Sequence, residues 1–285
     1  MVPLCILTVD LEDWFHQIGI ASFTDAATWA YLDSRIERNT NRLLDLFDDC
    51  GVRATFFCLG WVAQVYPSLV REVAARGHEI GCHSLLHRPI YDLSEPAFRE
   101  DLRSALGYLE SATGEKVRFF RAPGFSLNSN CLWALPVLNE EGITCDASFF
   151  SGTHAHGGFP GLDLQSPFRI LHGGTELLEL PATTIRLGPV TMAPTGGGYF
   201  RVLPYPVIRR MISSRSYIMS YIHPRDIDPD QPAPNNSSIW RTFKANIGLQ
   251  GSHAKLAKLL GDYNWRPIGE SMSYISPQRL PLVVL

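Results

Sequence analysis

The chain has 285 residues, a formal net charge of −3, 45% hydrophobic residues and 19% charged residues. This composition allows a large buried core and excludes globally disordered, low-complexity and collagen-like chains. The chain has no basic stripe, so nucleic acid is not expected as a partner. No apolar stretch reaches the roughly 18 residues that a membrane span requires.

Six cysteines are present, most of them in apolar runs and none in a Cys-x-x-Cys pair. They are expected to be buried free thiols, not a disulfide framework. The first residues show no basic segment followed by an apolar run and a small-residue cleavage site, because acidic residues begin at Asp10. These features predict a soluble, cytoplasmic protein.

Apolar runs alternate with helical spacing and stop glycines along the first 150 residues. Strands are expected at 4–9, 52–59, 78–81, 117–120 and 143–145, and helices at 35–50, 66–76, 94–113 and 129–141. Strand–helix pairs of about 25–35 residues are typical of parallel βαβ units.

The pattern becomes less regular after residue 150. It predicts short strands or loops at 177–180, 184–187 and 196–202, a helix at 204–213, a buried strand at 217–222, an exposed loop at 228–237, a helix at 239–260 interrupted near 248–251, and a strand at 265–268. We expect one barrel-like α/β domain that carries an insertion in its second half.

Four predicted strands end in polar residues, and functional groups collect at the carboxyl ends of parallel strands. The polar ends are Asp10-Leu11-Glu12-Asp13, His83 with His87, Arg121-Ala122-Pro123, and His223-Pro224. Their coincidence predicts a site at one edge of the sheet.

His83 and His87 are four residues apart, which on a helical turn would let both imidazoles share a metal ion. Ser84 stands where H-E-x-x-H metalloproteases have glutamate, so a base would have to come from elsewhere in the chain. The alternative is two histidines that pack or cap within a loop.

Asp10, Glu12 and Asp13 place three carboxylates within four residues. Like charges this close repel one another, so the segment needs a cation or a raised pKa. The alternative is an acidic loop that caps a helix.

These motifs resemble those of the NodB-homology polysaccharide deacetylases, carbohydrate esterase family 4. The family motifs T-F-D-D-G, H-[ST]-x-x-H, R-x-P and Leu-x-His resemble residues 8–13, 83–87, 121–123 and 221–223. The branch with D-x-[DE] in its first motif is more similar, and residues 9–16, 196–201 and 223–228 resemble members encoded with exopolysaccharide and exosortase clusters.

The resemblance implies a distorted (β/α)7 barrel, with a single domain over 1–285 and a family-specific part from about 165 to 285. It also implies one divalent metal ion per chain, commonly zinc, held by His83, His87 and a carboxylate. The family's second aspartate adjoins the first, but Leu11 stands there in this chain. The D-x-[DE] pattern favours Glu12 as the carboxylate ligand, and the usual aspartate ligand favours Asp13.

Residue by residue, the resemblance makes Asp10 the general base and His223 the general acid. Arg121 would orient Asp10 and keep it ionised through a charge-assisted pair. Asp146 lies at another predicted strand end, where it would either raise the pKa of His223 or cap a turn.

Possible contacts with a sugar are Trp14, Pro123, Gly124, Phe125 and Tyr199, with Phe15 and Trp240 as further aromatic candidates. Aromatic rings could stack on a sugar face or belong to the core. Arg201 could meet an anionic substrate group or form a surface ion pair.

The expected function is hydrolysis of the acetamide of an N-acetylated sugar, whether free, nucleotide-linked, lipid-linked or polymeric. The setting would be the biosynthesis of a cell-surface polysaccharide of exopolysaccharide, O-antigen or peptidoglycan type. The alternatives are a hydrolase of another linear or cyclic amide, as in allantoinase-like relatives, and a catalytically inactive carbohydrate-binding barrel.

Overall fold

The computed structural model describes residues 2–20, 23–188, 190–232 and 246–285. The strands are β1 (Leu4–Leu11), β2 (Thr55–Cys58), β3 (Glu79–Cys82), β4 (Phe119–Phe120), β5 (Cys145–Asp146), β6 (Phe168–His172), β7 (Thr175–Glu179), β8 (Ile185–Leu187), β9 (Val190–Met192), β10 (Tyr217–Ile222), β11 (Trp265–Arg266) and β12 (Leu282–Val284). The α-helices are α1 (Ile36–Asp49), α2 (Gly60–Val65), α3 (Pro67–Ala75), α4 (Glu95–Thr113), α5 (Ala134–Glu140), α6 (Gly197–Val202), α7 (Tyr205–Ile212), α9 (Ser252–Asp262) and α10 (Ile268–Ser271).

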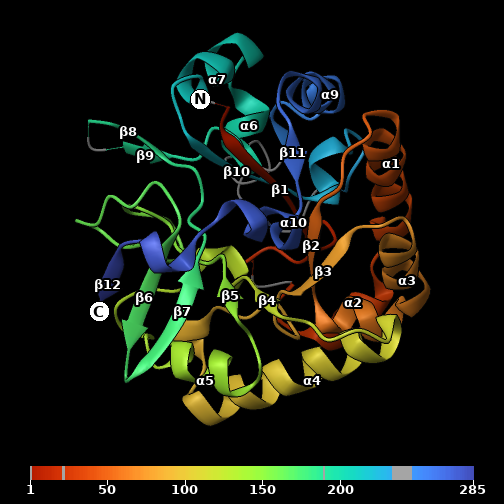
Figure 1. Cartoon of the computed structure of the whole chain (residues 1–285). Helices are drawn as coiled ribbons and strands as arrows, with labels where there is room; N and C mark the ends of the chain where they lie inside the picture. The colour runs from red at the N-terminus through yellow and green to blue at the C-terminus, as the bar shows by residue number, and fades with distance from the viewer. Residues whose placement is uncertain (1, 21–22, 189, 233–245) are drawn as a thin grey trace.

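The central sheet has the strand order β10-β1-β2-β3-β4-β5-β7-β6-β12, with β11 paired to β1 (Figure 1). All neighbours from β10 to β7 are parallel. These seven strands form the wall of a distorted barrel, and the antiparallel β6–β7 and β8–β9 pairs are additions in the second half of the chain. The predicted barrel-like α/β fold with an insertion is confirmed.

No ladder joins β7 to β10 in the described chain. The segment after β7 nevertheless runs close to β10, because the Met219 N–H donates to Thr183 Oγ1 at 2.7 Å and the Tyr217 hydroxyl donates to the Pro181 carbonyl at 3.0 Å. Side-chain hydrogen bonds thus connect the segment after β7 to β10 at this seam.

The core explains why the N-terminal elements form where the sequence predicts them. Strand β1 is buried on both faces, with Leu7 and Val9 on one face and Ile6 and Thr8 on the other all fully buried, as is typical of a parallel strand in a barrel wall. Helix α4 is capped at its start by Ser94, whose hydroxyl accepts from the Ala97 N–H, and at its end by Gly114 with φ 76°. Helices α1 to α5 lie along the outside of the sheet (Figure 1).

Other predictions need correction. Of residues 196–202, expected as a strand or loop, residues 197–202 form α6, and the expected final strand ends at Arg266, before α10 begins at Ile268. Helix α2 and strands β6, β9 and β12 were not predicted. They are short, and propensity carries little information over so few residues.

The expected loop at 228–237 and helix at 239–260 lie partly outside the described residues, as does Trp240; the second half of the helix is α9. None of the six cysteines is in a disulfide. Among the described helices, none has both the length and the apolar character needed to cross a bilayer.

Candidate active site

The predicted polar residues meet at one end of the sheet. Asp10 and Glu12 lie at the end of β1, His83 and His87 follow β3, Arg121 follows β4, and His223 follows β10. A pocket of about 280 Å³ opens here, lined among others by Asp10, Glu12, His87 and His223. Asp10 and Glu12 share one face because side chains two apart on an extended strand point the same way.

Glu12, His83 and His87 form a buried cluster whose possible ligand atoms all lie within 4.8 Å of one another. His87 Nε2 lies 3.2 Å from Glu12 Oε2. His83 Nδ1 lies 2.7 Å from the Arg121 main-chain oxygen, so that nitrogen donates and the Nε2 lone pair is left free. Neither histidine Nε2 has a hydrogen-bond partner in the described chain.

The protonation states of Glu12, His83 and His87 suit the binding of a cation. Burial lowers the pKa of His83, and it lowers that of His87 to about 4, so both imidazoles are neutral near pH 7. Burial alone would raise the pKa of Glu12, but His87 and His223 outweigh it and hold that pKa well below its usual range. Two neutral imidazoles and a carboxylate are a donor set that divalent metals such as zinc accept.

The two histidines do not lie on a helical turn. They belong to an irregular loop in which Ser84 (φ 67°) and His87 (φ 55°) both adopt the left-handed region. The Ser84 hydroxyl accepts from the His87 N–H at 3.1 Å, and Asp101 accepts from the Leu85 N–H at 2.8 Å. Positive φ at non-glycine residues is costly, and it is retained mainly where a site needs the resulting geometry.

Asp13, the alternative carboxylate ligand, is engaged elsewhere. One of its oxygens accepts from the Trp14 N–H at 2.8 Å, and the other from the Ser34 hydroxyl at 2.7 Å and the Arg35 N–H at 3.0 Å. Asp13 therefore ties the end of β1 to the start of α1. Of the two candidates, Glu12 is the carboxylate that reaches the histidines.

Arg121 is fully buried and lies beside Asp10. Its Nη1 donates to Asp10 Oδ1 and to Thr8 Oγ1, both at 2.7 Å, and its Nε donates to the Ala147 carbonyl at 3.1 Å. The guanidinium fixes Asp10 with a charge-assisted hydrogen bond, and the other carboxylate oxygen, Oδ2, lies 3.8 Å from His223 Nε2.

His223 is held by Asp226, a contact that was not predicted from the sequence. Its Nδ1 lies 2.8 Å from Asp226 Oδ2, and its Nε2 lies 3.2 Å from Glu12 Oε1. Burial would lower the pKa of His223, but Asp226 and Glu12 outweigh this and raise it to about 10. The three-residue spacing of His223 and Asp226, across the turn at Pro224–Ile227, is the sequence pattern from which this contact could have been predicted.

Asp146 does not take the predicted place beside His223. Its Oδ1 accepts from the Ser148 hydroxyl, and it interacts with Glu179 on the neighbouring strand. Burial and the charge of Asp146 raise the pKa of Glu179 well above its usual range, so Glu179 carries a proton that the two carboxyl groups share.

Arg201 also differs from the expectation of a surface ion pair, because it is buried and its Nε lies 3.2 Å from Asp226 Oδ1.

The expected sugar contacts fall into two groups. Gly124 and Phe125 line the pocket, whereas Pro123 is buried beside them without lining it, and Tyr199 is exposed on α6. Trp14 is buried against Phe15 and Phe23 and donates its indole N–H to the Asp33 carbonyl. Trp14 is thus a core residue, because the chain turns inward after Glu12.

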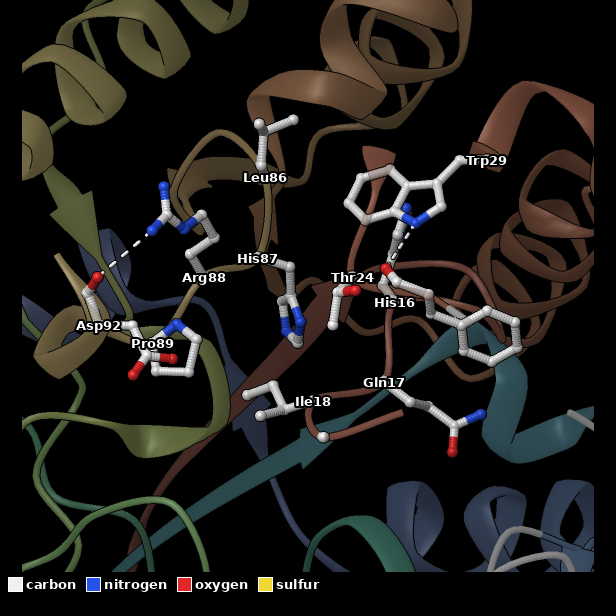
Figure 2. Close-up of a pocket in the computed structure, with 12 residues that line it drawn as sticks. His16, Gln17, Ile18, Thr24, Trp29, Leu86, His87, Arg88, Pro89 and Asp92 are labelled. Atoms are coloured by element: carbon white, nitrogen blue, oxygen red, sulfur yellow. Dashed lines mark hydrogen bonds between the residues drawn. The ribbon is translucent and has the colours of Figure 1, made fainter. Parts of the chain in front are cut away.

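A second pocket of about 310 Å³ adjoins the first and shares His16, Gln17, Ile18 and His87 with it. Figure 2 shows the His87 ring directed toward Ile18, with Trp29 and Thr24 on one side and Arg88 on the other. The two pockets form one groove that passes the histidine cluster.

The fold and the site define a class: barrel-like α/β proteins whose strand ends carry a His-His-carboxylate cluster beside an Asp–Arg pair. Residues 23–144 match the family model described as "Polysaccharide deacetylase", and residues 147–273 match "Domain of unknown function (DUF3473)". The chain therefore carries a polysaccharide deacetylase domain of the NodB type, carbohydrate esterase family 4, and the resemblance found in the sequence is confirmed.

A named relative agrees with this family, and solved structures agree with the fold. A peptidoglycan-N-acetylglucosamine deacetylase of Bacillus cereus is 26% identical over 155 residues, 49% of this chain and 56% of the relative; the chain thus spans little more than half of that protein. A candidate polysaccharide deacetylase from Mycobacterium smegmatis has the same fold, with a TM-score of 0.66, 18% identity and coverage of 100% of this chain and 94% of that one. Puue allantoinase also shares the fold, with a TM-score of 0.59, 15% identity and coverage of 95% and 90%.

Proposed function

We propose that the protein is a metal-dependent N-deacetylase that hydrolyses the acetamide of an N-acetylated sugar in a cell-surface polysaccharide or its precursor. The observation that carries the proposal is the meeting, in one pocket, of the Glu12–His83–His87 cluster with Asp10 and His223. Relatives named as peptidoglycan and chitin deacetylases support the substrate class.

Glu12, His83 and His87 would hold the divalent cation, since the free Nε2 atoms of both histidines fit that role. A bound cation would supply Lewis-acid polarisation of the acetamide carbonyl. Asp10, held by Arg121, would accept a proton from the attacking water. Protonated His223 would then donate a proton to the departing amine, so that acetate and a free amino sugar are formed.

Wild-type protein is expected to release amine from N-acetylglucosamine oligosaccharides and peptidoglycan fragments, and to leave allantoin intact. Amine release and ureide hydrolysis, measured on one preparation loaded in turn with Zn²⁺ and other divalent ions, test this. If allantoin were the only compound hydrolysed, the proposed function would change from sugar deacetylase to cyclic-amide hydrolase. Full activity in metal-depleted protein would overturn the proposed mechanism.

Glu12→Gln is expected to lower the metal content of the purified protein, because it replaces a charged ligand with a neutral amide. Asp13→Asn, at the next residue, is the matched control, and it is expected to retain the metal while losing about 1 kcal/mol of stability from the weakened link to α1. Elemental analysis and thermal melting separate the two effects. Metal loss in Asp13→Asn alone would reassign the ligand to Asp13.

A further inference from the structure

One positively charged side chain in this pocket, Arg225, has no role in the mechanism proposed above. Arg225 follows His223 at the end of β10 and is the sole arginine or lysine among the described residues that line this pocket. Its Nε is buried and has no hydrogen-bond partner, and no carboxylate of the described chain lies within 4.0 Å of its guanidinium. The sequence outside the described residues contains no aspartate or glutamate that could pair with it.

The other arginines around the groove are occupied. Arg121 binds Asp10, and Arg201 pairs with Asp226. Arg88, in the adjoining pocket, turns away toward Asp92 and donates to its main-chain oxygen at 3.3 Å (Figure 2). Within the part of the chain that the structure describes, Arg225 alone presents free guanidinium donors beside the proposed reacting groups.

Arg225 is half-buried as a whole, but its Nε is buried, and a buried guanidinium nitrogen without a partner is costly because an arginine cannot shed its charge. Burial and the nearby Arg201 lower the pKa of Arg225, which reflects that cost. An oxyanion on the ligand would remove it, since a guanidinium binds phosphate or carboxylate through two parallel hydrogen bonds.

We propose that Arg225 binds an anionic group of the substrate, on the N-acetylated sugar itself or on its immediate neighbour. Neutral chitin-like chains would then be hydrolysed, but with a lower kcat/KM than a phosphorylated or uronic acid-containing acetamido sugar. This inference rests on the proposed deacetylase function and specifies its substrate class.

The test compares N-acetylglucosamine, its 1-phosphate and N-acetylglucosaminuronic acid as substrates of the metal-loaded protein. Wild type is expected to prefer one of the two anions by at least about tenfold in kcat/KM, and the preferred anion identifies phosphate or carboxylate as the source of the charge. Arg225→Gln is expected to remove that preference, with a loss of about 10- to 100-fold that falls mainly on KM. Arg225→Lys should restore part of it, because it keeps the charge but not the planar fork.

Arg210→Gln, on the exposed face of α7, makes the same chemical change and should leave all three values unaltered. An equal loss on neutral and anionic sugars in Arg225→Gln would overturn the inference, because Arg225 would then act on Glu12 and not on substrate. If wild type hydrolyses none of the three sugars, the role of Arg225 can still be tested by binding. Calorimetry then compares the affinities of glucosamine 1-phosphate and glucosaminuronic acid with that of neutral glucosamine. Anion binding that Arg225→Gln abolishes supports the inference while the proposed activity fails, and equal binding by both proteins contradicts it.

Discussion

Asp10→Asn is expected to reduce turnover by about 100- to 10,000-fold, because the variant cannot accept a proton from water. The amide oxygen can still accept from Arg121, which also keeps its bonds to Thr8 and Ala147. The fold and the Glu12–His83–His87 cluster should therefore persist.

Steady-state turnover with metal analysis and a thermal melt on the same sample checks this expectation. Ser34→Ala is a useful control, since it removes a bond to the neighbouring carboxylate Asp13 without touching the pocket. Near-normal turnover in Asp10→Asn would show that another group is the base.

His223→Ala is expected to lower the rate by about 100-fold or more and to remove the alkaline limb of the pH–rate profile. A general acid acts in its protonated form, so the rate should fall as the pH rises through the pKa of His223, at about 10. Asp226→Asn removes one of the two carboxylates that raise this pKa. The alkaline limb should therefore move to lower pH in that variant.

The pH profiles of wild type, His223→Ala and Asp226→Asn, recorded at saturating substrate, distinguish these outcomes. An unchanged limb in His223→Ala would assign the acid role to a different residue. A normal limb in Asp226→Asn with reduced stability would limit Asp226 to a structural role, as the partner of Arg201.

The sequence allowed the strand ends to be predicted because the buried parallel strands are continuous apolar runs that stop at polar residues. The shared face of Asp10 and Glu12 followed from the period of a strand. The environment of His223 could not be predicted in this way. Asp226 reaches the imidazole because Pro224–Ile227 forms a 3-10 turn, and that turn depends on tertiary contacts such as the Arg201 pair.

The histidine pair was predicted for the wrong geometrical reason. A spacing of four residues suggests a helix, but Ser84 and His87 have positive φ values, which are incompatible with a helical turn. No local sequence pattern predicts these values. Asp101, from α4, holds the loop from a distance in sequence. Trp14 was misjudged similarly, since its burial depends on where the chain turns after β1.

The pairing of β1 with β10 has a consequence for how the protein acquires its shape. Thr8 Oγ1 donates to the Ser220 carbonyl, 212 residues further along the chain. Contacts between residues so far apart in sequence form slowly, because the chain loses the entropy of closing a long loop before the contact stabilises it. The proposed base is carried by β1 and the proposed acid follows β10, so a nascent chain lacking β10 would contain His83 and His87 but not His223. If these roles are correct, catalytic competence is a late event of folding, reached when β10 pairs with β1.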